Sequence, residues 1–186
     1  DSYNAIIIKG TGSKLRPTIF DLLAHEALDY FKAGDTYQTK PVYAFSIRDE
    51  QALAPMDIFS NAVFSTKDSS SQQWLALQLF QQLVAFHRND RNKEALLDVD
   101  MERIEWVYQH AIFADKETVY LKTLQNIIDQ YPSVTAASQA WYLLANKEME
   151  KARSYSPFDD TSGRFGYVRA IQLIEKALPL FKEPTA

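Results

Sequence analysis

The chain has 186 residues, of which 46% are apolar and 13% aromatic, enough to bury the core of one globular domain. Its formal net charge is -4 and its basic residues are dispersed, which argues against binding to nucleic-acid phosphates. Cysteine is absent, so the chain holds no disulfide, thiolate metal site or thiol nucleophile. The longest apolar run, Ala140–Ala145, has six residues, whereas a membrane-spanning helix needs about 20.

A first amphipathic helix is predicted from Thr18 to Lys32, because apolar residues recur there at spacings of three and four. Thr18 and Asp21 have the spacing of an N-terminal cap, and Gly34 suits the end of the helix. The sequence therefore predicts both the first and the last residues of this helix.

Residues 35–68 lose the helical period and are predicted to form one long irregular connection. Short helices are expected to interrupt it after Asp49 and around Pro55. Its aromatic side chains are expected to anchor it on the rest of the domain: Tyr37, Tyr43, Phe45, Phe59 and Phe64.

The next helix is predicted to begin after Ser69, Ser70 and Ser71, where Ser70 has capping-box spacing to Gln73, and to end near His87. Its apolar residues cover more than one face, which predicts burial on two sides. A third helix is predicted to start at Asp98 or Asp100.

Three further helices complete the series. Asp115 is expected to cap the fourth, which Pro132 ends because proline cannot continue a hydrogen-bonded turn. The fifth is predicted over 134–153 and the sixth over 164–178, with an exposed loop between them. The sixth is expected to pack through its regularly spaced apolar residues: Val168, Ile171, Ile174, Ala177 and Leu178.

The last two helices resemble a tetratricopeptide repeat, in which small and large residues alternate at helical spacing. The residues that carry the resemblance are Ala140, Trp141, Leu144, Ala145, Ala170, Ile174 and Ala177. Glu148 departs from the pattern, which has an aromatic residue there, and the loop between the helices is longer than usual. The sequence therefore predicts one all-α domain of about six helices in antiparallel pairs. The first helix and its lead-in span 1–34, the long connection spans 35–68, and helical hairpins span 69–186. The hairpins are predicted to be tetratricopeptide-like at 116–182.

The segment LRPTIFDLLAHEALDYF (Leu15–Phe31) resembles the helical region of large alpha-2-macroglobulin-like envelope proteins of the Bacteroides type, as do Tyr37–Pro41 and Asp98–His110 more loosely. The resemblance implies part of an exported protein that traps proteases through a bait segment, in many members with a thioester built from Cys-Gly-Glu-Gln. Neither element is found in the 186 residues, so no reactive residue carries over. The chain opens at Asp1 without a signal-type segment, and we expect a fragment of a larger protein in the periplasm or cell envelope, with the cytoplasm as the alternative.

Several segments come close to catalytic or metal-binding patterns. His25–Asp29 lacks the second His of the zinc-protease pattern His-Glu-x-x-His, so a solvated helix face is expected there. Gly10–Lys14 lacks the glycine spacing of a phosphate-binding loop. Asp98 and Asp100 carry cation-binding carboxylates without EF-hand spacing, so helix capping is the favoured interpretation.

His87 and His110 are dispersed, and no pairing of a hydroxyl nucleophile with a His base is recognisable. Accordingly, the chain is not predicted to be an enzyme or to hold a cofactor or metal. Large aromatics at helical spacing are usually core residues, which is the interpretation for Trp74, Trp106 and Trp141.

Two functions stay open. The first is a non-catalytic scaffold or interaction module of an exported alpha-2-macroglobulin-like, protease-trapping protein, in contact with neighbouring domains of the same polypeptide or with other proteins. The second is an independent tetratricopeptide-type module of the cell envelope that binds a peptide or protein. Neither requires nucleic acid or membrane insertion. The polar residues available for contacts are Asn126, Gln130, Asn146 and Arg169.

Overall fold

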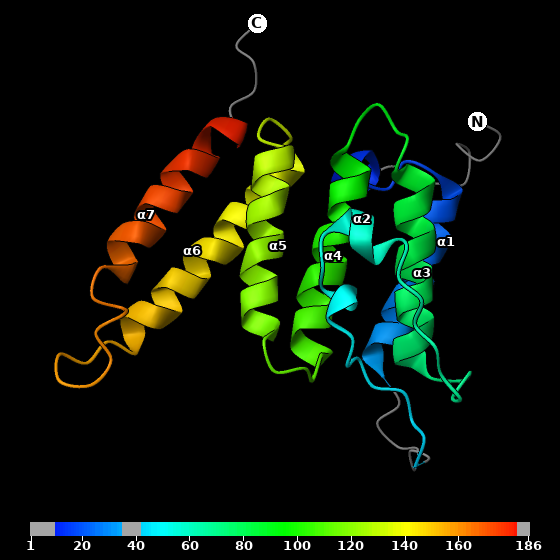
Figure 1. The fold of residues 1–186 in the computed structure, drawn as a ribbon. Coiled ribbons are helices and arrows are strands. Elements are labelled where there is room, and N and C mark those ends of the chain that lie inside the picture. Colours follow the sequence, from blue (N-terminus) through cyan, green and yellow to red (C-terminus); the bar gives the residue numbers. More distant parts are fainter. Residues whose placement is uncertain (1–9, 35–41, 182–186) are drawn as a thin grey trace, which may run out of the picture.

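The computed structural model describes residues 10–34 and 42–181, and these fold into helices without any strand (Figure 1). The prediction of an all-α chain is confirmed. Over these described residues the long helices number six, as predicted, and a short seventh lies inside the connection. The α-helices are α1 (Ile19–Ala33), α2 (Met56–Phe59), α3 (Gln72–His87), α4 (Glu94–His110), α5 (Lys116–Gln130), α6 (Ser138–Arg153) and α7 (Gly166–Ala177).

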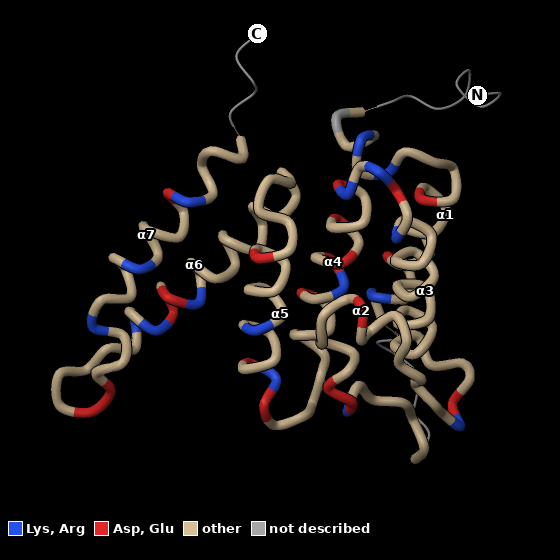
Figure 2. Tube along the Cα trace, turned by 45° about the horizontal axis from the view of Figure 1, so that its top comes forward, with Lys and Arg blue, Asp and Glu red and all other residues tan. Residues whose placement is uncertain are grey.

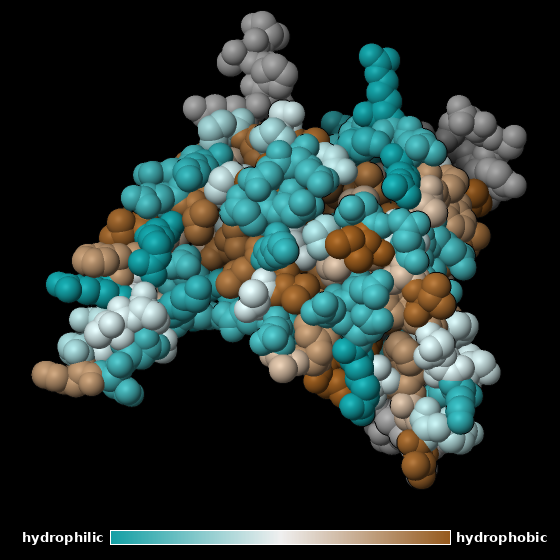
Figure 3. Space-filling model, in the orientation of Figure 1, coloured by the Kyte–Doolittle hydropathy of each residue, from teal (hydrophilic) through white to brown (hydrophobic). Residues whose placement is uncertain are grey.

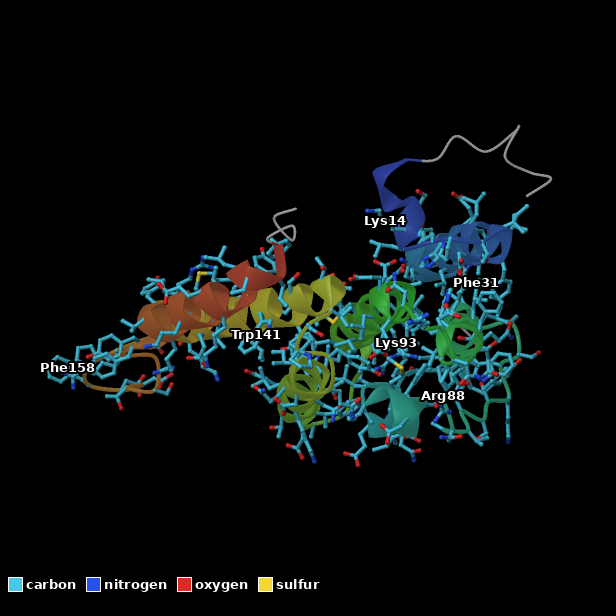
Figure 4. The ribbon with its side chains drawn as sticks, turned by 90° about the horizontal axis from the view of Figure 1, so that it is seen from above. Lys14, Phe31, Arg88, Lys93, Trp141 and Phe158 are labelled. Carbon is cyan, nitrogen blue, oxygen red and sulfur yellow. The ribbon has the colours of Figure 1, made fainter. Side chains whose placement is uncertain are left out.

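Consecutive long helices lie side by side and antiparallel, from α1 through α3, α4, α5 and α6 to α7 (Figure 1). Seen from above, α1 lies behind α3 and α2 lies on the opposite side of the α3–α4 layer (Figure 4). The α6–α7 hairpin extends away from this body as an arm, and the lower edge of the molecule is hollowed beneath it (Figure 3).

The start of α1 is capped as predicted. The Thr18 hydroxyl accepts a hydrogen bond from the Asp21 N–H at 3.2 Å, and the Asp21 carboxylate accepts from the Thr18 N–H at 2.8 Å. Two backbone donors that the helix leaves free are thereby satisfied. Gly34 follows the last residue with a φ of 69°, a conformation that glycine adopts without strain.

The start of α3 after the three serines is confirmed, but its predicted cap is corrected. Ser71 rather than Ser70 caps the helix by accepting from the Trp74 N–H at 3.3 Å, while Ser70 donates to Asp68. The helix packs on both α1 and α4, which confirms burial on two sides.

The start of α4 differs more, because the helix begins at Glu94 rather than at Asp98 or Asp100. Asp100 is fully buried and pairs with Arg103 one turn later, so its carboxylate is occupied inside the helix. Neither aspartate acts as the predicted cap.

The connection contains the two predicted short helices. A 3-10 turn, Glu50–Ala52, follows Asp49, and α2 follows Pro55. Of the predicted aromatic anchors in the described range, Phe59 and Phe64 are buried and Phe45 packs against the core, whereas Tyr43 is exposed. Tyr37 and the rest of 35–41 lie outside the described residues.

Side chains from three helices hold the connection in place by binding its carbonyl groups. Arg103 of α4 donates to Ala52 and Ala54, and the Thr123 hydroxyl of α5 donates to Leu53 at 2.8 Å. Gln81 and Trp74, both on α3, bind carbonyl groups further along the connection. A segment without regular structure is therefore fixed by donors that the helices supply.

The C-terminal helices largely follow the predicted bounds. Asp115 occupies the N-cap position of α5 without a side-chain hydrogen bond, and the helix ends just before Pro132. A 3-10 turn, Thr135–Ala137, precedes α6, so that helix begins later than predicted. The loop after α6 is mostly exposed, as predicted, and Phe158 lies at its tip (Figure 4).

Candidate interaction surface on α7

The backbones of α6 and α7 approach each other closely where α7 begins. A Cβ atom on Gly163 would lie 1.8 Å from the Lys151 carbonyl oxygen, and one on Gly166 would lie 2.4 Å from the Glu148 carbonyl oxygen. Only glycine allows so close an approach at these two positions. Buried Ala170 and Ala177, further along α7, continue the contact with α6.

Polar contacts fix the orientation of the same pair of helices. Arg169 of α7 forms an ion pair with Glu148 of α6 and donates to the Ser162 carbonyl at 3.2 Å. The Lys176 ammonium lies 5.6 Å from the centre of the Trp141 ring, which Figure 4 labels on α6. The hairpin is thus joined by small residues at its start and by charged contacts along its length.

The apolar residues that were predicted to pack α7 into the core are exposed instead. Val168, Ile171, Ile174 and Leu178 are each at least 37% exposed, and of the predicted set only Ala177 is buried. Packing on α6 uses the neighbouring face of the helix, whose side chains are smaller. The prediction of a core face was therefore wrong for most of its residues.

The exposed residues form one continuous band. We call it the α7 stripe, and it consists of Tyr167, Ile171, Ile174, Leu178 and Phe181, with exposed fractions from 37% to 62%. Their spacings of four, three, four and three residues place them along a single line of the helix and its 3-10 extension, Leu178–Phe181. This is the spacing by which one helix packs along another.

A shallow groove borders the α7 stripe where α7 meets the first turns of α6. Its volume is about 310 Å³. Tyr142 on the α6 side is 54% exposed, so the rim is apolar on both helices. The groove is lined by Ser138, Gln139, Tyr142, Ile174, Ala177, Leu178 and Phe181. Acidic and basic residues are interspersed along α5, α6 and α7 (Figure 2), so the apolar character sets this surface apart more than charge does.

The predicted contact residues lie on three different helices. Asn126 and Gln130 are on α5, Asn146 is on α6 and Arg169 is on α7. Gln130 is exposed and the other three are half-buried. Arg169 is already engaged by Glu148, which leaves its guanidinium less available to a ligand. None of the four belongs to the α7 stripe or lines the groove, and sequence reasoning missed both features.

A cluster of charges joins α1 to α4 and corrects the prediction for His25. That side chain is buried rather than solvated, and its Nδ1 lies 3.0 Å from Glu102 Oε2. Lys32 also pairs with Glu102, and Arg16 lies 3.7 Å from Asp98. Burial acts to raise the pKa of Glu102, but the contacts with His25 and Lys32 outweigh it and lower the pKa to about 2.

His87 joins α1 to the turn after α3. Its Nε2 lies 2.6 Å from Asp21 and its Nδ1 lies 2.7 Å from Asp90. Each ring nitrogen therefore lies within hydrogen-bond distance of a carboxylate oxygen. His87 and Asp21 are fully buried, which fits the structural role predicted for His87. The His110 ring is tilted against the Trp106 ring, with 4.9 Å between their centres, and its Nδ1 lies 2.8 Å from the Trp106 carbonyl oxygen.

The phosphate-loop candidate and the three tryptophans are part of the helical framework. Residues 11–14 form a 3-10 turn that leads into α1. Trp106 is buried, as predicted, whereas Trp74 and Trp141 are half-buried and pack against the core. Within residues 10–34 and 42–181, no three acidic or His side chains converge in a way that could hold a metal ion.

Comparison of the chain with protein-family models, with curated proteins and with solved structures finds no match in any of the three. Over the described part of the chain, no helix has both the length and the apolarity that crossing a membrane requires.

Proposed function

We propose that the chain is a non-catalytic helical scaffold whose α7 stripe binds an amphipathic α-helix of a neighbouring domain. The observation that carries the proposal is the spacing of the exposed apolar residues from Tyr167 to Phe181. The stripe repeats every seven residues, from Tyr167 to Ile174 and from Ile174 to Phe181. Two such intervals on one face are typical of a helix that packs along a second helix. An extended peptide or a small molecule would not require that period.

The exposed surface is consistent with a specific interface. The α7 stripe together with Val168 and Tyr142 presents seven large apolar side chains, each at least 37% exposed. Large apolar side chains on the surface of a monomer are usually scattered singly, and a group of them commonly marks a site of protein contact.

The docking helix is proposed to belong to the same polypeptide, an exported alpha-2-macroglobulin-like protein. Support for this part comes from the resemblance carried by Leu15–Phe31. In that setting the domain would space its neighbours within a protein of the periplasm or cell envelope, and the α6–α7 arm would be the point of attachment.

An independent tetratricopeptide-type receptor for peptides is the second candidate. In its favour, the amides of Asn126, Gln130 and Asn146 make no hydrogen bond within the described part of the chain. If the chain is such a receptor, calorimetric titration of the isolated chain with a free extended peptide would show saturable micromolar binding. If the chain binds its partner through the α7 stripe, the same titration would show no binding.

Photo-crosslinking in the native cell tests the first proposal and identifies the partner. A benzophenone amino acid is placed at Ile171 or Ile174, on the α7 stripe, or at Gln172, which is exposed on another face of the same helix. Adducts from Ile171 and Ile174, with crosslinked positions three or four residues apart in the partner segment, are expected. Equal adducts from Gln172, or none from the α7 stripe, would refute the proposal.

A further inference from the structure

A second cavity lies in the long connection, and none of its lining residues belongs to a helix. Its volume is about 410 Å³, within the range of about 300 to 1,000 Å³ that ligand pockets span. Two segments without helical structure line it, residues 43–49 and 63–67. We call this cavity the slot.

The second of these segments has the burial pattern of a strand. Ala62 and Phe64 are buried, whereas Val63 and Ser65, the residue after each of them, are exposed. This two-residue period is what an extended chain shows when one of its faces packs on a core. In the first segment, Ile47 is buried and Phe45 packs against the core, while Ala44 and Ser46 are half-buried.

Neither segment has a strand partner. Over the described residues, no backbone–backbone hydrogen bond joins the two segments. The Phe45 N–H donates instead to the carboxylate of Asp68, just beyond the second segment, at 3.3 Å. The backbone N–H and C=O groups of Ala44, Ser46, Val63 and Ser65 make no hydrogen bond. Four residues that line one cavity therefore have free backbone donors and acceptors.

The direction of the free groups follows from those that are bonded. The carbonyl oxygens of Ala62 and Phe64 accept from Gln81 and Trp74 of α3, at 2.8 and 2.7 Å. Successive residues of an extended chain direct their backbone groups to opposite edges, so the groups of Val63 and Ser65 point away from α3. Val63 and Ser65 both line the slot, and their backbone groups are available to whatever enters it.

We propose that the slot binds an extended strand of another polypeptide, with apolar side chains at alternate positions, through backbone hydrogen bonds to residues 44–46 and 63–65. Strands that pair lie about 4.8 Å apart, so one inserted strand can bond to an edge on each side. The strand's apolar side chains would pack beside Phe45 and Phe64, and its polar ones would face solvent. This site is separate from the α7 stripe, which fits a helix.

The test uses the full chain and one synthetic probe, an acetylated and amidated octapeptide of sequence Lys-Val-Thr-Val-Thr-Val-Thr-Lys. Amide ¹H–¹⁵N spectra are recorded on titration with the probe. Shifts confined to residues 43–49 and 63–67 are expected at up to about 1 mM peptide. No binding at that concentration, or shifts on the α7 stripe instead, would overturn the proposal.

A matched pair of variants isolates the backbone. Ser65→Pro removes one free N–H, whereas Ser65→Ala keeps it and removes only the exposed hydroxyl. Ser65→Pro is expected to weaken binding at least about tenfold and Ser65→Ala to leave it unchanged, because a peptide hydrogen bond is lost in the first alone. If both variants bind equally, the slot does not act through its backbone.

The same loss is expected when the probe is changed instead of the protein. N-methylation of its three Val residues removes donors from one edge of the peptide and leaves the chain intact, so the result stands even if Ser65→Pro lowers stability. Unweakened binding of the methylated probe also counts against the proposal. None of these outcomes depends on what covers the α7 stripe.

Discussion

Arg103 is the buried cation that ties the connection to α4, and its replacement by Leu is expected to cost about 3 to 5 kcal/mol of unfolding free energy. Its Nε lies 2.8 Å from Asp100 Oδ1, and its two terminal nitrogens donate to Ala52 and Ala54 at 2.6 and 3.1 Å. Its guanidinium also lies 4.3 Å from the centre of the Phe59 ring. Its loss leaves a carboxylate and two carbonyl groups buried without donors, each at a cost of about 1 to 3 kcal/mol, so the upper end of the range is expected.

Urea unfolding followed by circular dichroism at pH 7 measures this cost in four variants. Asp100→Leu and Arg103→Leu are made singly and together, and the double variant is expected to lose at least about 2 kcal/mol less than the sum, since it leaves no unpaired charge. Glu150→Gln is the control. This substitution breaks the ion pair between Glu150 and Lys147, which are three residues apart like Asp100 and Arg103. Because Glu150 is exposed, a loss of unfolding free energy under about 0.5 kcal/mol is expected. Additive losses, or an Arg103→Leu effect as small as the control, would refute the reasoning.

Two other substitutions test the contacts between helices. The lowered pKa of Glu102, about 2 against an ordinary 4.5, means that its contribution is complete above pH 4.5 and fades as the pH falls toward 2. Glu102→Gln should therefore lower the free energy of unfolding by about 2 to 3 kcal/mol at pH 7 and by progressively less in acid. Urea titrations in which the difference between the variant and the native chain does not change with pH would contradict this. Gly163→Ala should lower the midpoint of thermal unfolding by about 5 °C or more, because the added methyl group meets the Lys151 carbonyl. Gly12→Ala is the control, since its methyl group enters open space and should shift the midpoint by about 1 °C at most. Equal midpoints for the two variants would count against the close approach of α6 and α7.

Local signals in the sequence were sufficient for most of the fold. The cap at Thr18 and the stop at Pro132 act within a few residues of themselves, so their effect can be predicted from the chain alone. Whether a side chain is covered is a property of tertiary packing. His25 was expected on a solvated face, yet α4 covers it and supplies Glu102.

The candidate site could not be predicted for the same reason. The apolar period of α7 is evident in the sequence, but a period does not reveal which of two adjacent faces meets the neighbouring helix. Gly163 and Gly166 decide that question, because they bring α7 onto α6 through its small-residue face and leave Ile171 and Leu178 exposed. The two glycines, one just before α7 and one at its first residue, were the signal that could have pointed to the exposed face.

Cysteine labelling tests most directly whether the α7 stripe is an occupied docking surface, because the chain has no native cysteine. Ile171→Cys and the fully exposed Phe158→Cys are labelled with maleimide, in the isolated chain and in cells that express the protein from its own locus. Labelling at position 171 is expected to be at least about tenfold slower in cells than in isolation, with no such change at 158. Equal rates at position 171 in the two settings would contradict the account.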